Sequence, residues 1–274
     1  MLIQISDDFD LPKIAESGQC FRWTKVDLDS YRIIAGEKCL YITAYEDNVF
    51  ELDCTEESYS CFWRDYFDLN EKYQSIRARI EQEKDPFLWQ AADREKGIRI
   101  LRQDPWEILI SFIISQNKNI PAISRCVESL AARFGEKKTD SKGLEYDGFP
   151  KPEVIAVLSE KDLLDCGLGY RWKYVHAAAK AVLAGDIDLN KLVTSDAETA
   201  VKALTSLYGV GIKVANCVLL FGLHHTDAFP VDVWIKRILA DQYPGGYPFE
   251  KYSPYNGIFQ QYMFAYYRQK ERCK

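Results

Sequence analysis

The chain has 274 residues, of which 47% are hydrophobic and 28% charged, and its formal net charge is -6 at pH 7. This composition is ordinary for a soluble globular protein and provides enough apolar material for one large domain or two modest ones. The acidic balance argues mildly against a nucleic-acid partner, because such proteins usually carry a basic surface, although net charge says little about a local patch.

Eight cysteines are scattered along the chain, and no two have the CxxC spacing. The start, "MLIQISDDFD", has neither a basic segment nor a long apolar stretch, so we expect no signal peptide. Without export, the thiols should be reduced. The apolar run "VLLFGL" is far too short to cross a bilayer. We therefore expect a reduced, cytoplasmic, soluble protein without a membrane partner.

The N-terminal part of the chain predicts an antiparallel sheet. In "KCLYITAYED", Cys39 and Tyr41 alternate with Leu40 and Ile42, which is the period of a strand. A turn at Asp47-Asn48 leads into a further strand, "NVFEL". The stretches "FRWTKV" and "YRIIAG" are similar, and "SGQ" (17–19) is a loop before the first of them.

From about Glu71 the hydrophobic period becomes helical. In "QDPWEILISFIISQNKN", Asp104 can cap a helix, Pro105 takes the first helical position and Glu107 can close a capping box. The sequence predicts an α+β fold, with a sheet domain and linking helices over 1–100 and a helical domain over 101–274. The later predicted helices are "PEVIAVLSEKDLLDC" ended by Gly167, "YRWKYVHAAAKAVLAG" ended by Gly185, "AETAVKALTSL", "VDVWIKRILADQY" and "GIFQQYMFAYYRQK".

The stretch "LYGVGIKVANC" predicts a helix-hairpin-helix over about 204–221. Gly209 and Gly211 permit positive φ and let the backbone approach a partner closely. The N–H groups of the turn and of the second helix suit a DNA phosphate that is held without reading sequence. The alternative is a helical hairpin with glycines for geometry alone, and "GVG" by itself favours that alternative.

Lys213 lies at the N-terminus of an otherwise apolar helix, where the helix dipole disfavours its charge. Such a position favours a neutral, nucleophilic amine. Cys217, four residues later, shares its helix face. The alternative is an amine that reaches solvent while its stem packs. Asp232 follows a proline and precedes a helix, so it is either a plain N-cap or the carboxylate of a catalytic pair with Lys213.

The combination of "GVGIK" and "PVDV" resembles the helix-hairpin-helix DNA glycosylases, and most closely the 8-oxoguanine DNA glycosylases. The resemblance covers nearly the whole chain. "SGQCFRW" is similar to the N-terminal signature of that family, "LRQDPWEILISFIISQNKNI" to its helix with an asparagine loop, and "GLGYR" to its intercalating loop. "YGVGIKVANC" and "FPVDV" resemble its catalytic core, and "FQQYMF" its C-terminal pocket helix.

The resemblance implies a twisted antiparallel sheet followed by a helical body, with the active cleft between helical layers. It implies a base excision repair enzyme that extrudes 8-oxoguanine from duplex DNA, removes it and cleaves the strand. Lys213 matches the nucleophile that forms a Schiff base with the sugar. Asp232 matches the carboxylate that stabilises positive charge developing on the sugar.

The family's lesion-binding residues carry over to this chain as well. Gly18 matches the residue whose carbonyl accepts from N7–H, which 8-oxoguanine has and guanine lacks. Cys217 and Phe264 match the two sides of a stacking sandwich, and Gln260 matches the reader of the base-pairing edge. Phe221 and Pro230 match residues of the pocket lining. For Phe221 and Phe264, an ordinary core position is the alternative.

On the DNA side, Asn117 matches the residue that fills the space left by the flipped base, Tyr170 the wedge beside it, and Arg171 the contact to the estranged cytosine. An ordinary helix start is the alternative for Tyr170 and Arg171. Two positions depart from the family pattern: Ala122 stands where a second arginine is expected, and Trp234 where a histidine contacts phosphate. The hairpin residues Gly209, Val210 and Gly211 would hold phosphate.

Rival interpretations remain within and outside this superfamily. An iron–sulfur cluster needs four closely spaced C-terminal cysteines, and only Cys273 lies there, so we expect no cluster and no metal site. A structural cation on hairpin carbonyls such as that of Val210 stays open. Lys213 argues against an alkylated-base glycosylase, and Lys213 with Asp232 argues against a non-catalytic DNA-binding module. The expected partner is double-stranded DNA containing 8-oxoguanine, bound by a monomer.

Overall fold

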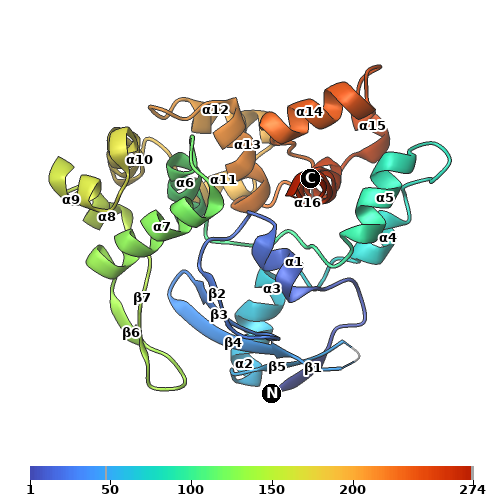
Figure 1. Ribbon diagram of the computed structural model, residues 1–274. Helices are drawn as coiled ribbons and strands as arrows, with labels where there is room; N and C mark the ends of the chain where they lie inside the picture. The colour runs from blue at the N-terminus through green and yellow to red at the C-terminus, as the bar shows by residue number, and fades with distance from the viewer. Residues whose placement is uncertain (47, 273–274) are drawn as a thin grey trace.

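The computed structural model describes residues 1–46 and 48–272, and its fold is α+β, as the sequence predicts. Asp47 of the predicted turn and Cys273 lie outside the described residues. An antiparallel sheet stands at one end of the molecule and a helical body at the other (Figure 1). No helix within the described ranges is long and apolar enough to span a membrane.

Five strands form one antiparallel sheet in the order β1-β5-β4-β3-β2. The strands predicted from the alternating pattern are confirmed, and a short N-terminal strand, β1, pairs with β5 at the sheet edge. A separate two-stranded hairpin is formed by β6 and β7. The strands are β1 (Leu2–Gln4), β2 (Trp23–Asp27), β3 (Ser30–Ala35), β4 (Lys38–Ala44), β5 (Val49–Leu52), β6 (Lys137–Thr139) and β7 (Glu145–Asp147).

The alternation along β4 gives the sheet two different faces. Leu40 and Ile42 are fully buried in the core of the sheet domain. On the opposite face, the Tyr41 hydroxyl donates to Asp140 beside β6, and Arg32 forms an ion pair with the same carboxylate at 3.0 Å. The β6–β7 hairpin of the helical body therefore covers the sheet on the side away from its core.

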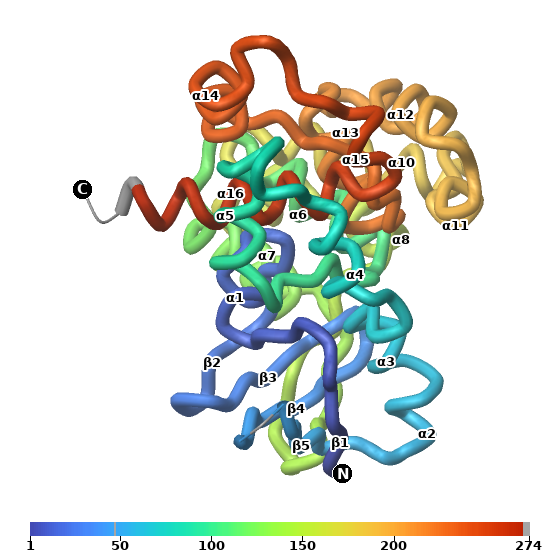
Figure 2. Tube along the Cα trace, turned by 90° about the vertical axis from the view of Figure 1, so that its right-hand side faces the viewer, coloured from blue at the N-terminus to red at the C-terminus, as the bar shows by residue number. Residues whose placement is uncertain are grey.

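Helices make up the rest of the chain, and α16 packs between α5 and α14 near the middle of the body (Figure 2). A π-helical turn spans Tyr59–Trp63 and a 3-10 turn spans Gly169–Arg171. The α-helices are α1 (Leu11–Glu16), α2 (Glu56–Ser58), α3 (Arg64–Tyr66), α4 (Tyr73–Arg77), α5 (Pro86–Arg94), α6 (Pro105–Ile114), α7 (Ile120–Phe134), α8 (Pro152–Ile155), α9 (Glu160–Asp165), α10 (Trp172–Ala184), α11 (Leu189–Val193), α12 (Ala197–Thr205), α13 (Ile212–Phe221), α14 (Val233–Gln242), α15 (Phe249–Tyr252) and α16 (Asn256–Arg272).

The predicted start of α6 is confirmed, because Asp104 accepts from the N–H of Glu107 and Pro105 takes the first turn. The predicted capping box does not form. Burial raises the pKa of Glu107 to about 7, while the charge of Arg22 in the sheet domain opposes this rise. The Glu107 side chain is thus buried at the contact between the sheet and the helices and does not cap the helix.

The single helix predicted from "PEVIAVLSEKDLLDC" is wrong, since the segment forms α8 and α9. Ser159 interrupts it by capping α9: its hydroxyl accepts from the N–H of Asp162, and the Asp162 carboxylate accepts from the N–H of Ser159. This reciprocal capping box satisfies backbone groups that a continuous helix would have paired internally. The predicted end of α10 is confirmed, with Gly185 in the left-handed conformation.

Two apolar cores lie beneath the two parts of the molecule. One core contains buried side chains of the strands, α1 and α3, and the other contains those of the helices from α4 onward. The buried side chains between Tyr73 and Ile100 belong to the helical core, whereas Leu101 belongs to the sheet core. The chain thus crosses between the cores more than once, and the domain division near residue 100 stays a prediction.

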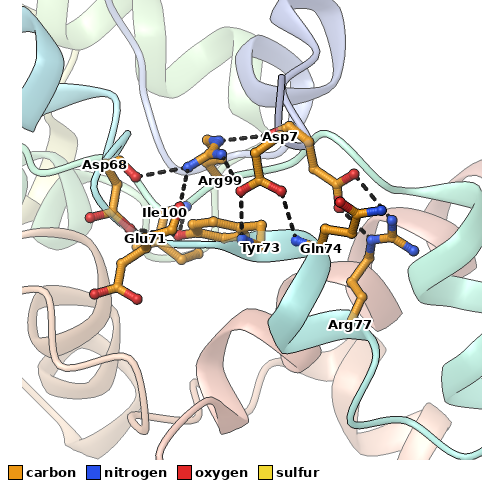
Figure 3. A network of polar contacts seen from close by, with 9 residues as sticks. Asp7, Asp68, Glu71, Tyr73, Gln74, Arg77, Arg99 and Ile100 are labelled. Carbon is orange, nitrogen blue, oxygen red and sulfur yellow. Dashed lines mark hydrogen bonds and ion pairs between the residues drawn. The ribbon is translucent and has the colours of Figure 1, made fainter. Parts of the chain in front are cut away.

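The guanidinium of Arg99, a side chain only 1% exposed, joins segments from both sides of this crossing (Figure 3). Its Nη2 lies 2.7 Å from Asp7 Oδ2, its Nε donates to the Asp8 carbonyl at 2.6 Å, and its Nη1 donates to the Asp68 carbonyl at 2.7 Å. Its carbon also lies 4.5 Å from the centre of the Tyr73 ring. Arg99 thus fixes the N-terminal segment, the end of the sheet domain and α4 to one another.

Asp7 completes this network by capping α4 from outside the helix, since its carboxylate accepts from the N–H groups of Tyr73 at 2.7 Å and Gln74 at 2.9 Å. Burial alone would raise the pKa of Asp7, but three backbone N–H groups and the Arg99 charge outweigh it and lower the pKa. A carboxyl with a lowered folded-state pKa stabilises the fold above its unfolded-state value of about 3.9. That contribution is lost as the pH falls through the lowered value.

We expect Arg99→Met to lower the free energy of unfolding by about 3–5 kcal/mol, because it removes the cationic partner of Asp7 and a donor to three backbone carbonyls. Urea unfolding at pH 7 measures the loss. Arg133→Met is the matched control: Arg133 Nη2 lies 3.3 Å from Asp165 Oδ2, and the two side chains are 43% and 36% exposed, so we expect a loss of at most about 1 kcal/mol. Equal losses in the two variants would contradict the special role of Arg99.

Candidate active site

The predicted helix-hairpin-helix is present, with α12 and α13 joined through residues 206–211. Gly209 has φ +82°, and a Cβ there would lie 2.2 Å from the ring of Tyr174, so only glycine fits this turn. The expectation of positive φ at Gly211 is wrong, since its φ is -93°. A Cβ at Gly211 would meet nothing within 4 Å. Gly211 therefore leaves the outer face of the hairpin open without needing the left-handed conformation.

Lys213 and Cys217 lie together on α13, as their spacing predicts. The Lys213 amine lies 5.6 Å from the centre of the Phe112 ring, beside the Cys217 sulfur. Burial raises the pKa of the Cys217 thiol to about 11, although the charge of Lys213 and its hydrogen bond oppose that rise. Cys217 is therefore a neutral thiol at physiological pH, and the half-buried amine beside it lies against apolar side chains.

Asp232 is the N-cap of α14, as predicted. Its Oδ1 accepts from the N–H groups of Trp234 at 3.0 Å and Ile235 at 2.9 Å. Both bonds go to one oxygen of the carboxylate, and Asp232 also lines the cavity described below. The two cap bonds fix the side chain at the start of α14. The N-cap reading and the reading as part of a catalytic pair are thus compatible.

A cavity of ≈ 410 Å³ brings the two charged side chains together. Its wall comes from the loop before β2, from α6 and the start of α7, from α13, from the segment that leads into α14, and from α16. Every predicted catalytic and substrate-binding residue lines it: Gly18, Lys213, Cys217, Phe221, Pro230, Asp232, Gln260 and Phe264, together with Trp234. The residues that sequence reasoning missed are Ser17, Phe21, Phe112, Ser115, Lys118, Asn119, Ile120, Pro121, Ile123, Gln261 and Arg268.

Aromatic side chains make much of this wall. Phe112 stacks on Phe221, with ring centres 5.3 Å apart and an interplanar angle of 15°. Phe221 is therefore both a core residue and a lining residue, so the two interpretations of it do not exclude each other. Phe112 lies in α6, and its place in the cavity had no signal in the sequence.

Gly18 brings the sheet domain to the cavity. Its φ is +83°, and a Cβ would lie 3.0 Å from Ile120 Cδ1 and 3.7 Å from Phe264. The neighbouring Gln19 anchors the loop, because its amide accepts from the N–H of Leu101 at 2.9 Å and donates to the Arg99 carbonyl at 2.8 Å. The position of Gly18 is thus tied to the same segment that carries the Arg99 network.

The predicted DNA-contacting residues of two loops lie side by side outside the cavity. Asn117 has φ +52°, and its amide donates to the Tyr170 hydroxyl at 3.1 Å. Tyr170 is exposed, as a wedge must be. The expectation of an exposed Arg171 is wrong, since Arg171 is 6% exposed and donates to the carbonyls of Gln116 at 2.6 Å and Leu168 at 3.2 Å.

Gln116 ties these loops to the hairpin. Its side-chain amide donates to the Gly209 carbonyl at 3.1 Å, while its own carbonyl accepts from Arg171. The asparagine loop, the wedge and the helix-hairpin-helix therefore form one continuous surface before any DNA is bound. Nothing in the sequence pattern indicated this role for Gln116.

A helix-hairpin-helix beside a cavity that holds a lysine and a helix-capping aspartate defines a DNA-processing enzyme of the base-excision type. Residues 2–109 match the family model described as 8-oxoguanine DNA glycosylase, N-terminal domain. Residues 110–244 match the model described as HhH-GPD superfamily base excision DNA repair protein.

Known relatives span most of the chain. A probable N-glycosylase/DNA lyase of Methanothermobacter thermautotrophicus is 31% identical over 87% of this chain and 84% of its own length. The N-glycosylase/DNA lyase of Saccharomyces cerevisiae is 32% identical over 85% of this chain and 68% of its own. The crystal structure of the Clostridium acetobutylicum 8-oxoguanine glycosylase/lyase with DNA containing cytosine opposite the lesion has a TM-score of 0.89 at 34% identity, covering 99% of this chain and 98% of that one. The chain belongs to the 8-oxoguanine DNA glycosylase family.

Proposed function

We propose that this chain excises 8-oxoguanine from duplex DNA and cleaves the strand, with Lys213 as its nucleophile. The observation that carries the proposal is that Lys213 and Asp232 line the same cavity, on the first turns of two neighbouring helices. A binding module that only holds phosphate has no need of a half-buried amine and a fixed carboxylate that line one cavity. Its place of action would be the chromosome in the cytoplasm.

The proposed reaction follows from these two groups. The damaged nucleotide leaves the duplex and enters the cavity. The neutral Lys213 amine attacks C1′ of the sugar, the glycosidic bond breaks, and the base leaves with its electrons and takes up a proton. Asp232 stabilises the positive charge that develops on the sugar. The ring then opens to a Schiff base, and loss of a C2′ proton eliminates the 3′ phosphate.

The other residues of the cavity wall would recognise the damaged base. The Gly18 carbonyl accepts from N7–H of 8-oxoguanine and repels the N7 lone pair of guanine. Cys217 and Phe264 would stack on the two faces of the base, and Gln260 would read its pairing edge. The neutral state of the buried Cys217 thiol suits a stacking surface, because a thiolate would need solvation that the cavity does not supply. Phe221 and Pro230 would close the floor.

The contacts to the DNA duplex would come from the hairpin and from the loops beside it. The backbone of Gly209, Val210 and Gly211 would hold phosphate, and the Trp234 indole N–H would donate to another phosphate oxygen. Asn117 and Tyr170 would occupy the gap left by the flipped nucleotide. Arg171 must exchange its carbonyl partners for the estranged cytosine, which makes that contact an induced one.

The proposal needs no organic cofactor and no iron–sulfur cluster, and the protein would act as a monomer. A cation held by hairpin carbonyls, with that of Val210 as a candidate ligand, stays a prediction. The main rivals are a non-catalytic helix-hairpin-helix protein and a glycosylase for another damaged base. Borohydride trapping on a duplex containing 8-oxoguanine separates them, because only a Schiff base gives a covalent adduct with that substrate.

We expect Lys213→Gln to keep DNA binding and to lose both excision and borohydride trapping. The amide removes the nucleophile while retaining a polar side chain of similar length. Lys118→Gln is the matched control, because Lys118 is a second lysine of the cavity wall, and this variant should still be trapped. Strand cleavage by pure Lys213→Gln protein would sink the assignment, as would loss of trapping in Lys118→Gln alone.

Gly18→Ala should reduce excision while affinity for an abasic-site analogue stays largely intact. The added methyl meets Ile120 and requires a left-handed backbone that alanine disfavours by roughly 1–2 kcal/mol, so the carbonyl is displaced. Gly143→Ala is the control, since Gly143 has φ +78° but nothing within 4 Å of a Cβ. Equal losses of excision and abasic-site binding in Gly18→Ala would instead point to misfolding of the sheet domain.

The last prediction concerns the base opposite the lesion. Cytosine presents acceptors that suit arginine, and this chain keeps Arg171 but has Ala122 where the family pattern has a second arginine. A good bidentate base contact contributes roughly 1–3 kcal/mol of discrimination. We therefore expect a preference for cytosine that is weaker by about tenfold to a hundredfold than two arginines would give, with appreciable excision opposite the other bases.

Single-turnover excision on four duplexes that differ only in the opposite base measures this preference. Ala122→Arg should restore part of it, because position 122 lies in the first turn of α7, where the side chain of Asn119 caps the helix. A native preference for cytosine of several hundredfold would show that another residue has taken over the task.

A further inference from the structure

Two consecutive glutamines of α16 reach the cavity wall, although only Gln260 was expected there. Gln260 is 3% exposed and Gln261 is 4% exposed, and both line the cavity. Consecutive residues of a helix point about 100° apart, so it is unusual for both to reach one site. Their burial means that each amide must find hydrogen-bond partners within the protein or in a bound substrate.

The two amides form a chain of hydrogen bonds that begins at a backbone carbonyl. Gln260 Nε2 donates to the Pro230 carbonyl at 3.1 Å, and Gln261 Nε2 donates to Gln260 Oε1 at 3.2 Å. A carbonyl can only accept, so the Gln260 amide must turn its NH₂ group toward Pro230. Its oxygen then faces Gln261, which donates to it. The opposite orientation of Gln260 would set oxygen against oxygen at Pro230 and NH₂ against NH₂ at Gln261.

These two hydrogen bonds leave the Gln260 amide with one free N–H and one free lone pair, and they fix which end of the amide carries each. A side-chain amide in that state can pair with a base edge that offers a carbonyl beside a ring N–H. The six-membered ring of guanine has that edge, with O6 as acceptor and N1–H as donor. Adenine has the reverse, with an amino group at position 6 and a lone pair on N1. Only an amide that turned over would pair with the adenine-type edge.

We propose that Gln261 is a positioning residue that locks the amide of Gln260, so that the cavity accepts 6-oxo purine lesions and rejects 6-amino ones. This role of Gln261 rests on the proposed function and adds a second determinant of the substrate class. The Gly18 carbonyl reads N7–H, which 8-oxoguanine and 8-oxoadenine share. The locked amide reads the edge at which these two lesions differ.

A second observation separates this role from a purely structural one. Gln261 Oε1 is buried and has no hydrogen-bond partner among residues 1–46 and 48–272. An unpaired buried acceptor destabilises a fold, because its desolvation is not offset by a hydrogen bond. Gln261 is therefore a poor choice for stability alone. Gln261→Met keeps the length of the side chain and removes both this unpaired oxygen and the donor to Gln260 Oε1, so the two effects on the melting temperature oppose each other and we expect it to change little.

The test is single-turnover excision from two duplexes that carry 8-oxoguanine or 8-oxoadenine opposite the same base. We expect Gln261→Met to lower the ratio of the two rates by roughly fivefold to tenfold, the worth of about one hydrogen bond. Gln261→Glu should lower it further, because a carboxylate repels Gln260 Oε1 and favours the reversed amide, whose NH₂ group it can accept from. Gln269→Met, the same change at an exposed position of α16, should leave the ratio unaltered.

The same discrimination can be measured as a ratio of binding affinities for the two duplexes, with Lys213→Gln present in every protein so that no excision occurs. Slow excision of 8-oxoadenine then does not obscure the result. An unchanged ratio in Gln261→Met overturns the inference, as does an equal fall of both rates together with a lower melting temperature. Failure of the native protein to excise 8-oxoguanine would instead overturn the proposed function, while the affinity ratio would still judge Gln261.

Discussion

The buried guanidinium of Arg99 is the interaction on which the geometry of the cavity depends. The wall of the cavity comes from two separate cores, because Gly18 follows α1 of the sheet domain whereas Lys213 and Asp232 belong to the helical body. The proposed role of the Gly18 carbonyl, to distinguish one hydrogen atom on a base, requires that it be held to within a fraction of an ångström. Arg99 provides this rigidity by bonding Asp7 and three backbone carbonyls, while its own carbonyl accepts from the Gln19 amide.

The same segment reaches the catalytic helix from its other end. The Gln103 amide donates to the Gln19 carbonyl at 3.0 Å and lies 3.3 Å from the Phe221 carbonyl at the end of α13. One short stretch of extended chain, 99–103, thus sets the distance between the Gly18 loop and the helix that carries Lys213. The two residues of the proposed catalytic pair both lie at helix N-termini, with Lys213 in the first turn of α13 and Asp232 as the N-cap of α14.

Local chemistry explains which features could be predicted from the sequence. The cap of α6, the glycine end of α10 and the hairpin each depend on a few neighbouring residues, so a short stretch of sequence determines them. The cavity residues were predictable because several motifs of one family occur in order along the chain. The side chains whose positions were wrongly predicted interact with partners that are distant in the sequence. Glu107 turns to the sheet domain, and Arg171 turns inward to the Gln116 carbonyl.

Other features were unpredictable for related reasons. Ser159 splits a stretch whose apolar period alone fits one helix, because a reciprocal cap with Asp162 competes with the continuous ladder. Gln261 gives no signal in the sequence, since its role depends on the direction in which a neighbouring amide is turned. That direction follows from the Pro230 carbonyl, which comes from a different part of the chain.

The neutral thiol of Cys217 has a consequence for the conditions under which the enzyme must work. Peroxides attack thiolates far faster than thiols, and access to the sulfur limits the reaction further. With a pKa of about 11 and a buried position, Cys217 resists conversion to a sulfenic acid that would fill the cavity with a polar group. Cys61 is exposed and stands outside the cavity wall, so its oxidation leaves the site intact. An enzyme that removes oxidised bases can therefore keep its own pocket reduced while the oxidant that made its substrate is still present.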